Sequence, residues 1–208
     1  MDRITLSMLA QFSEENGLLA HAESIRFEHI ACYATVQKLY DESFDTGIVV
    51  LGGQETGIDG IAIIVNGVLI ADLDEFFEVS SKTDSLDVSF VFVQAKTSSS
   101  FDTGKMGTFA FAVRDFFKDL PTIPQSERIK DLAKIQSAIY AAGSKFKKAN
   151  PRLHLFYVST GQKTDDKILE ARRKTEIDGL KSENIFSSVE FECVGAAELQ
   201  ALYRQLYG

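Results

Sequence analysis

Three residues in this sequence have types and spacing suited to chemistry: Asp59, Gln94 and Lys96. Gln94 and Lys96 end the apolar run FVFVQAK (90–96), and they share one face of a predicted strand because side chains alternate across a strand. Asp59 opens a second apolar run, GIDGIAIIV, where alternation places it on the face of Ile61, Ile63 and Val65. If the two runs pair side by side, a carboxylate, an amide oxygen and an ammonium meet at one end of one sheet face.

Each of these residues also has a plainer interpretation. An aspartate at the head of an apolar strand can cap a turn, and a polar pair at the end of a strand can mark the point where the strand meets solvent. The combination of the three side-chain types at one end of a sheet is what favours a functional site.

The elements that position these residues are predicted from hydrophobic periodicity and turn signals. The segment 20–42 is predicted to be a helix, with Glu28 on its apolar stripe. Two short strands at 48–51 and 58–65 follow, and the turn Asn66-Gly67 predicts a hairpin into VLIAD. The remaining predicted elements are a strand at 87–96, helices at 105–120 and 126–148, a strand at 154–160, a helix at 164–182, a strand at 189–194 and a helix at 196–207.

This order of helix, three strands, helices, strand, helix, strand and helix predicts an α/β/α sandwich around a mixed β-sheet. We expect a single domain over residues 1–208, with a core at about 20–160 and a C-terminal helix–strand–helix extension. A chain that stops directly after a helix suits the N-terminal part of a longer protein.

The composition narrows the class of protein. The chain has 208 residues and a net charge of -8, which argues against an indiscriminate nucleic-acid binder because such proteins carry an excess of lysine and arginine. No run approaches the roughly 20 apolar residues of a membrane span, and no secretory signal is present, so no membrane partner and a cytoplasmic location are expected. The two cysteines and three histidines form neither a disulfide framework nor a zinc pattern.

Two other motifs have structural rather than chemical interpretations. The phrase FDTG occurs at 44–47 and 101–104, but the polar residues before each copy do not match the apolar strands that precede an aspartic-protease aspartate. Both copies are predicted to be turns in which glycine supplies an unusual dihedral angle. The stretch GGQETGIDG lacks the Lys-Ser/Thr of a phosphate-binding loop, so its glycines are expected to shape the link between strands.

The set formed by Gly57-Ile58-Asp59-Gly60 and Phe92-Val93-Gln94-Ala95-Lys96 resembles the PD-(D/E)XK nuclease superfamily, in the Mrr-like form in which glutamine replaces the second acid to give QxK. The order of elements extends this resemblance over roughly residues 20–160. More narrowly, TGIDGIAIIVNG and VFVQAKTSSSFDTGKM resemble the N-terminal nuclease-like domain of the AIPR (abortive infection phage resistance) proteins of bacteria.

The resemblance implies a restriction endonuclease-like fold and hydrolysis of phosphodiester bonds with Mg²⁺, for which Mn²⁺ could substitute. It implies that Asp59, Glu28, Gln94 and the carbonyl of Ala95 hold the metal, and that Lys96 neutralises the phosphate and orients or helps deprotonate the water. Gln94 departs from the acidic pattern, and a neutral ligand weakens metal binding. Three reserve acids stand in IADLDEFF, where a solvated hairpin edge is the plainer interpretation: Asp72, Asp74 and Glu75.

The expected substrate is nucleic acid, in the first instance DNA. Ser98 could contact phosphates, and two basic groups could line the substrate path, although charge runs on helices are usually solvated faces. The groups are Lys145, Lys147, Lys148 and Arg152, and Arg172, Arg173 and Lys174. A homodimer is possible for such a protein. The alternative functions are a nuclease-like fold that no longer cuts and instead binds nucleic acid or a partner protein, and a plain interaction domain.

Overall fold

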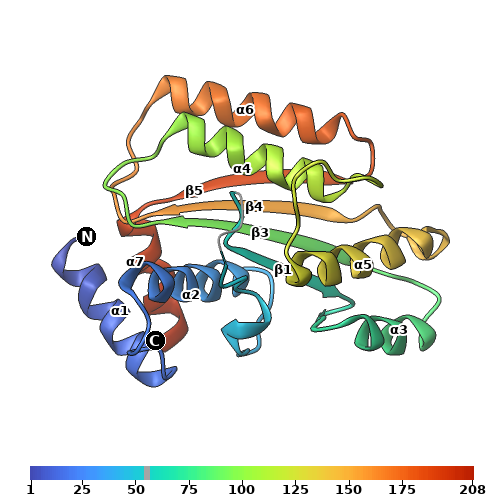
Figure 1. Ribbon diagram of the computed structural model, residues 1–208, viewed down its shortest axis with the longest axis horizontal. Helices are drawn as coiled ribbons and strands as arrows, with labels where there is room; N and C mark the ends of the chain where they lie inside the picture. The colour runs from blue at the N-terminus through green and yellow to red at the C-terminus, as the bar shows by residue number, and fades with distance from the viewer. Residues whose placement is uncertain (54–56) are drawn as a thin grey trace.

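The computed structural model describes residues 1–53 and 57–208 of the chain (Figure 1). These residues form a mixed sheet of five strands with helices on both faces, so the predicted α/β/α sandwich is confirmed. The elements in chain order are α1 (Arg3–Glu15), α2 (Glu23–Val36), η1 (Thr46–Ile48), β1 (Gly60–Val65), β2 (Val68–Leu69), α3 (Leu73–Ser81), β3 (Val88–Lys96), α4 (Thr103–Phe116), α5 (Glu127–Ala141), η2 (Gly143–Lys145), β4 (Arg152–Ser159), α6 (Lys167–Lys181), β5 (Ser188–Val194) and α7 (Ala196–Tyr207).

The strand order in the sheet is β2-β1-β3-β4-β5. β1 runs antiparallel to both β2 and β3, whereas β3, β4 and β5 run parallel to one another. β3 is therefore the central strand, and all but its last residue are buried, which explains its almost unbroken apolar sequence. The C-terminal ends of the three parallel strands lie together at one end of the sheet, at the left of Figure 1.

Each face of the sheet packs on its own hydrophobic cluster. Phe90 and Phe92 of β3 point into the cluster that the sheet forms with α4, α5 and α6. Val91, Val93 and Ala95 point into the other cluster, which is completed by α1, α2 and α7. The alternation predicted for β3 is thus confirmed, and we refer below to the α4 face and the α2 face of the sheet (Figure 1).

Two helices and one strand differ from the sequence prediction. α1 and α3 were not predicted, because each buries few large apolar side chains: Leu9 and Phe12 in α1, and Phe76 in α3. The predicted strand at 48–51 is replaced by the short helix η1 and a single bridge from Val50 to Gly60. The remaining predicted elements are present, but the helices predicted to end at 42 and 148 end earlier, at Val36 and Ala141.

Both FDTG motifs have structural roles, but their aspartates supply helix caps, and their glycines do not supply the predicted unusual dihedral angles. Asp45 and Asp102, the aspartates of the two FDTG copies, cap η1 and α4 by accepting from the N–H groups of Gly47 and Lys105, each at 2.8 Å. Their glycines have ordinary φ values, whereas the hairpin residues Asn66 and Gly67 have the predicted positive φ of 51° and 77°. Residues 54–56 of GGQETGIDG lie outside the described residues.

Among the described residues, no helix combines the length and the apolar character needed to span a membrane.

Candidate functional site

The candidate site lies where β1 separates from β3. Gly60 is the ladder partner of Val93, and the N–H of Asp59 also donates to the Val93 carbonyl at 2.8 Å. Two residues opposite one is the arrangement of a β-bulge, which bends the strand and redirects a side chain. Ile58, before the bulge, packs on the same α4 face as Ile61, although strict alternation would place them on opposite faces.

The bulge changes the direction of the Asp59 side chain. Strict alternation predicted that Asp59 shares the face of Ile61, Ile63 and Val65, and this prediction is wrong. Oδ2 of Asp59 accepts from the N–H of Ala95 at 2.7 Å and so takes the place of the next β1 carbonyl in the ladder. The carboxylate therefore lies beside β3, and its charge acts on Glu28 and Cys32 of α2.

Glycine is required at position 60 because α2 approaches the bulge closely. A Cβ atom built on Gly60 would lie 2.4 Å from Sγ of Cys32, well inside van der Waals contact. This close approach brings Glu28, one turn before Cys32 on the same helix, toward the Asp59 carboxylate. The Asp-Gly pair was the sequence signal for the bulge, but the position of Cys32 against it was not predictable.

Lys96 and Glu28 join Asp59 electrostatically. Nζ of Lys96 lies 3.9 Å from Oδ2 of Asp59, with its side chain 35% exposed. Burial raises the pKa of Glu28 to about 7, the negative charge of Asp59 adds to the rise, and Lys96 opposes it. Burial also raises the pKa of Asp59, while the bond from Ala95 and the charge of Lys96 lower it. Buried Asp59 and half-buried Glu28 thus share one partly exposed cation.

Gln94 lies on the opposite face of the sheet from the Asp59 carboxylate. Its place in the strand puts it on the α4 face with Phe90 and Phe92, and it is 2% exposed. Its Oε1 atom has no hydrogen-bond partner among the described residues, and no hydrogen bond there joins it to Asp59, Glu28 or Lys96. The structure therefore brings Asp59, Glu28 and Lys96 together at one end of the sheet, with Gln94 next to them in the ladder but facing α4.

The oxygen atoms present fit a hard cation. No group of three or more His, Cys, Asp and Glu side chains in the described part of the chain is arranged to hold a metal. The candidate donors are instead the two carboxylates of Asp59 and Glu28 and the Ala95 carbonyl, which points to the same side of β3 as the N–H bonded to Asp59, whereas the predicted ligand Gln94 faces α4 and does not join them. Magnesium accepts such a small set of oxygens because it keeps several of its waters.

The predicted lysine group is not at this end of the sheet. The carbonyl of Lys145 accepts from the N–H of Leu86, just before β3 begins, whereas the candidate site lies at the end of that strand. β3 has nine residues, so the two places are roughly 26 Å apart along the strand. Nζ of Lys145 also donates to the carbonyls of Ser80 and Thr83, and only Lys147 and Lys148 are exposed.

Of the other residues predicted to take part in the site, Ser98 lies at the same end of the sheet as Asp59. Its hydroxyl donates to the Ser100 carbonyl at 3.0 Å. The basic residues of α6 are held in ion pairs within that helix, Arg172 with Glu176 and both Arg173 and Lys174 with Glu170. Asp72 is the N-cap of α3, and Asp74 and Glu75 lie in its first turn, so these reserve acids belong to a helix and not to a hairpin edge.

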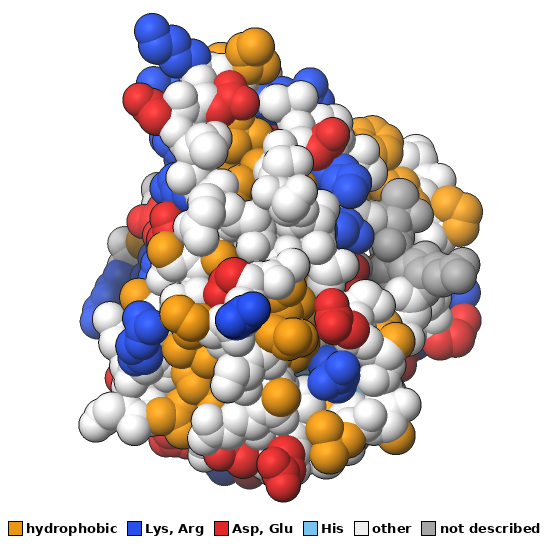
Figure 2. Space-filling view, turned by 90° about the vertical axis from the view of Figure 1, so that its left-hand side faces the viewer, with side chains coloured by type: hydrophobic (Ala, Val, Ile, Leu, Met, Phe, Trp, Pro, Cys, Tyr) orange, Lys and Arg blue, Asp and Glu red, His pale blue; other side chains and the backbone are white. Residues whose placement is uncertain are grey.

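The face of the molecule at this end of the sheet has no single charge sign. Figure 2 looks onto it and shows basic and acidic side chains interspersed with apolar ones. This mixture agrees with the net charge of -8 and favours a few local phosphate contacts over a broad basic surface.

No protein-family model, curated protein or solved structure matches the chain.

Proposed function

We propose that this chain is a Mg²⁺-dependent nuclease domain of the PD-(D/E)XK type, in the Mrr-like form, which hydrolyses phosphodiester bonds of DNA in the phage defence of a bacterium. The observation that supports it most directly is the meeting of Asp59, Glu28 and Lys96 at the bulge where β1 leaves β3. An acid just before β1, an acid on α2 and a lysine at the end of β3 are the residue types that the proposed hydrolysis would use.

In this proposal Asp59, Glu28 and the Ala95 carbonyl would hold the metal, which when bound would supply charge to stabilise the leaving oxygen and to activate a water. Lys96 places its ammonium against the attacked phosphate, where a compact cation offsets the negative charge that develops. Glu28, whose pKa is raised to about 7 by burial and by the charge of Asp59, would release its proton on binding a cation.

The test is calorimetric titration with Mg²⁺ and Mn²⁺ beside a cleavage assay on duplex and single-stranded DNA and on RNA. Asp59→Asn is the sharpest variant, because the amide oxygen can still accept from Ala95 while the charge is lost. We expect it to abolish both metal binding and cleavage. Gln94→Glu is the matched control, because its side chain faces α4 and should leave Mg²⁺ binding unchanged.

A second function is favoured by the position of Gln94, which is 2% exposed and faces α4. A nuclease-like module that no longer cuts could keep the fold and bind nucleic acid or a partner protein. Wild-type protein that cleaves no substrate, together with the same metal response in wild type, Asp59→Asn and Gln94→Glu, would replace the nuclease proposal with this one.

A further inference from the structure

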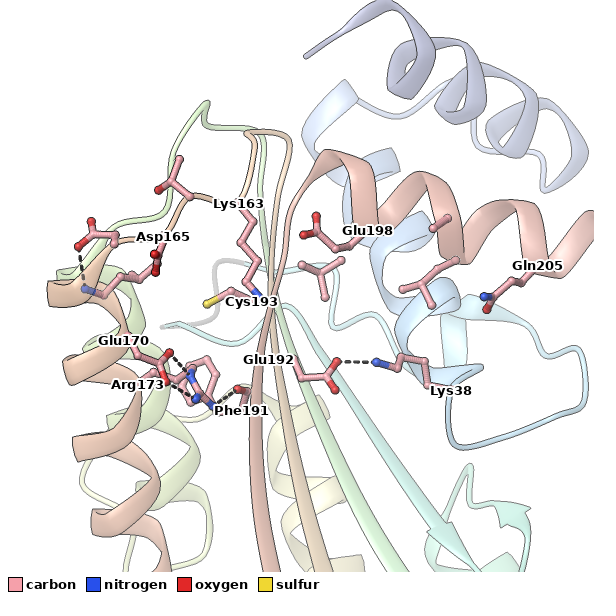
Figure 3. Close-up of a pocket in the computed structure, with 16 residues that line it drawn as sticks. Lys38, Lys163, Asp165, Glu170, Arg173, Phe191, Glu192, Cys193, Glu198 and Gln205 are labelled. Atoms are coloured by element: carbon pink, nitrogen blue, oxygen red, sulfur yellow. Dashed lines mark hydrogen bonds and ion pairs between the residues drawn. The ribbon is translucent and has the colours of Figure 1, made fainter.

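A groove runs along the free edge of β5, away from the candidate site. β5 is the last strand of the sheet, and α6 and α7 rise on either side of its open edge (Figure 3). The groove has a volume of about 760 Å³, and its floor is formed by residues 191–194 of β5. Its walls include the apolar side chains Leu169 of α6 and Ala201 and Leu202 of α7.

Backbone groups of β5 face this groove. The Phe191 carbonyl accepts from Nη1 of Arg173 on α6 at 2.9 Å, so the Phe191 backbone points outward and not toward β4. Alternate residues of a strand point the same way, which places the N–H and C=O groups of Val189 and Cys193 on the groove side. The N–H of Ala196, which has the opposite parity, donates to Gly161 just past β4, in agreement with this assignment.

The outward backbone groups of Val189 and Cys193 are unpaired among the described residues, whereas the Phe191 carbonyl is bonded to Arg173. Among the described residues, no hydrogen bond joins the backbone of Val189 or Cys193 to any group on the groove side. β5 contains neither proline nor a bulge, which are common ways to block an edge strand. The edge is therefore a template for one more strand, and the two helices restrict what can reach it.

We propose that the β5 groove binds an extended segment of another polypeptide, which adds a sixth strand to the sheet and presents basic side chains to the α7 wall. Main-chain hydrogen bonds to Val189, to Cys193 and to the N–H of Phe191 would give affinity, while the Phe191 carbonyl stays with Arg173, and the groove walls would select the side chains.

The charges of the groove select a basic segment. Five acids and three bases line it: Asp165, Asp166, Glu170, Glu192 and Glu198, and Lys38, Lys163 and Arg173. Arg173 and Lys38 are already paired with Glu170 and Glu192. Oε2 of Glu198 is buried and has no hydrogen-bond partner among the described residues, so it is an acceptor in need of a donor. A lysine or arginine of the added strand would supply one.

A second copy of this chain is a poorer occupant. Antiparallel pairing of β5 with itself, in registers centred on Glu190, Phe191 or Glu192, sets a glutamate against a glutamate on the α2 face of the sheet. Like charges directly opposite each other destabilise a strand pair.

The probe is a labelled peptide of three Lys-Val repeats, titrated into the full chain by fluorescence anisotropy. Ala201→Arg and Ala197→Arg form a matched pair, because both alanines are exposed on α7 one turn apart but only Ala201 lines the groove. We expect Ala201→Arg to weaken binding by about tenfold or more, and Ala197→Arg to leave it unchanged.

Two further peptides separate strand addition from charge attraction. A version of the same peptide with alternate backbone nitrogens methylated keeps its charge but loses N–H donors, and should bind about tenfold or more weakly. A peptide of three Glu-Val repeats should bind more weakly still. Equal binding of the methylated peptide, equal binding of the acidic peptide, no binding of the basic peptide, or equal effects of the two arginine variants would overturn the proposal.

Discussion

Asp59 is the residue on which the candidate site depends, because its carboxylate has two tasks. It satisfies the Ala95 N–H that β1 leaves unpaired, and it forms a negative centre with Glu28 opposite Lys96. A purely structural aspartate would need only the first of these interactions. The second raises the pKa of a neighbouring acid, and such perturbed groups gather at functional sites.

Lys96 is expected to serve cleavage without serving metal binding. Lys96→Ala removes the cation that offsets the charge on the phosphate, so cleavage should slow by on the order of 10²-fold. Mg²⁺ binding measured by calorimetry should persist, because no metal ligand is lost. Lys148→Ala is the control, since Lys148 is an exposed lysine at the other end of the sheet. Equal loss of activity in both variants would contradict the role given to Lys96.

Glu28 should make the metal-free protein less stable at higher pH. Its pKa is raised from 4.5 to about 7 on folding, so above pH 4.5 the unfolded chain loses this proton more readily than the folded one. The free energy of unfolding should therefore fall between pH 4.5 and about pH 7 and change no further above that range on account of this group.

Urea unfolding in EDTA at several pH values measures this dependence, and Glu28→Gln should flatten it. A variant with the same slope as wild type would show that Glu28 titrates normally.

For single residues, the sequence predicted which side chains form the candidate site better than it predicted the sheet face to which each side chain points. The pairing of Asp59 with the QxK strand followed from alternation and spacing, and it placed Asp59 at the correct end of β3. The bulge at Asp59 and Gly60 breaks that alternation, and Cys32 of α2 packs so closely against it that only glycine fits at position 60. The face that Asp59 presents was therefore set by tertiary packing.

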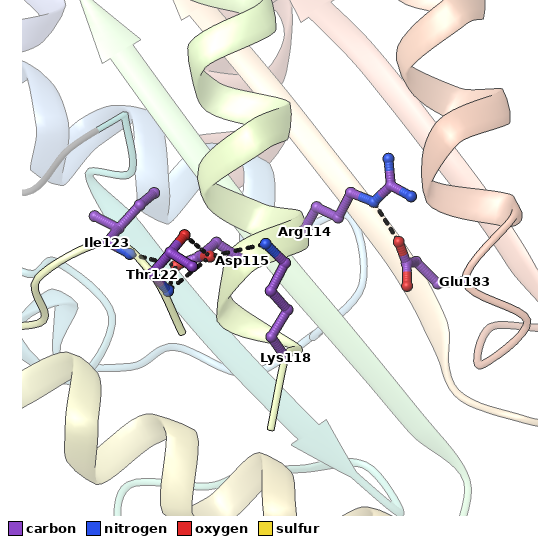
Figure 4. Close-up of polar contacts among 6 residues, drawn as sticks. All are labelled: Arg114, Asp115, Lys118, Thr122, Ile123 and Glu183. Carbon is purple, nitrogen blue, oxygen red and sulfur yellow. Dashed lines mark hydrogen bonds and ion pairs between the residues drawn. The ribbon is translucent and has the colours of Figure 1, made fainter. Parts of the chain in front are cut away.

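Among the elements, the loop after α4 has a clamp of its own. Asp115 is 2% exposed and accepts hydrogen bonds from both N–H groups and the hydroxyl of the Thr122-Ile123 segment, while Lys118 lies 3.3 Å away (Figure 4). The prolines around this segment break the helix, and Asp115 fixes the path of the chain into α5.

Removing this clamp should destabilise the protein. Asp115→Ala removes the acceptor of these part-buried hydrogen bonds and should cost about 1–2 kcal/mol in the free energy of unfolding. Asp119→Ala, an exposed aspartate of the same loop, should change it by less than about 0.5 kcal/mol. Burial would raise the pKa of Asp115, but the bonds from Thr122 and Ile123 overcome it and lower the pKa to about 2.

The sign of the pH effect follows from that lowered pKa. The contribution of Asp115 to stability is complete above its unfolded pKa of 3.8 and is lost as the pH falls toward about 2. The difference between wild type and Asp115→Ala in urea unfolding should shrink over that range. A difference that stays constant from pH 6 to pH 2.5 would show that the carboxylate charge is not what the clamp uses.

The elements that sequence patterns predicted well are those with a strong local signal. β3, β4 and β5 are apolar runs between clear breakers, and the turn Asn66-Gly67 fixes the β1–β2 hairpin. α3 has a weaker signal, since it buries little beyond Phe76 and begins at a cap among other acids. The segment 48–51 has the composition of a strand, but Asp45 caps a short helix there and only Val50 pairs with the sheet.

For the whole molecule, the direction of the parallel strands separates two possible substrate surfaces. Lys96, Ser98 and the loops that follow β3 and β4 lie at one end of the sheet, while Lys147 and Lys148 lie at the other. The site end holds exposed lysines beyond Lys96, among them Lys105 in the first turn of α4 and Lys163 after β4. DNA that reaches Asp59 would pass these two lysines and not the distant pair.

Two double charge-reversal variants of equal net charge test which pair of lysines contacts DNA. Lys105→Glu with Lys163→Glu, and Lys147→Glu with Lys148→Glu, each change the net charge by -4, from -8 to -12, so long-range repulsion of DNA is the same in both. Binding to duplex DNA is measured over a range of salt concentrations, in Ca²⁺ to prevent cleavage. The site-end variant should bind more weakly, with a salt slope reduced by about 2 because two phosphate contacts are lost. The distant variant should keep the wild-type slope. A reduced slope in the distant variant alone would place the substrate at the other end of the sheet and separate DNA binding from the Asp59 site.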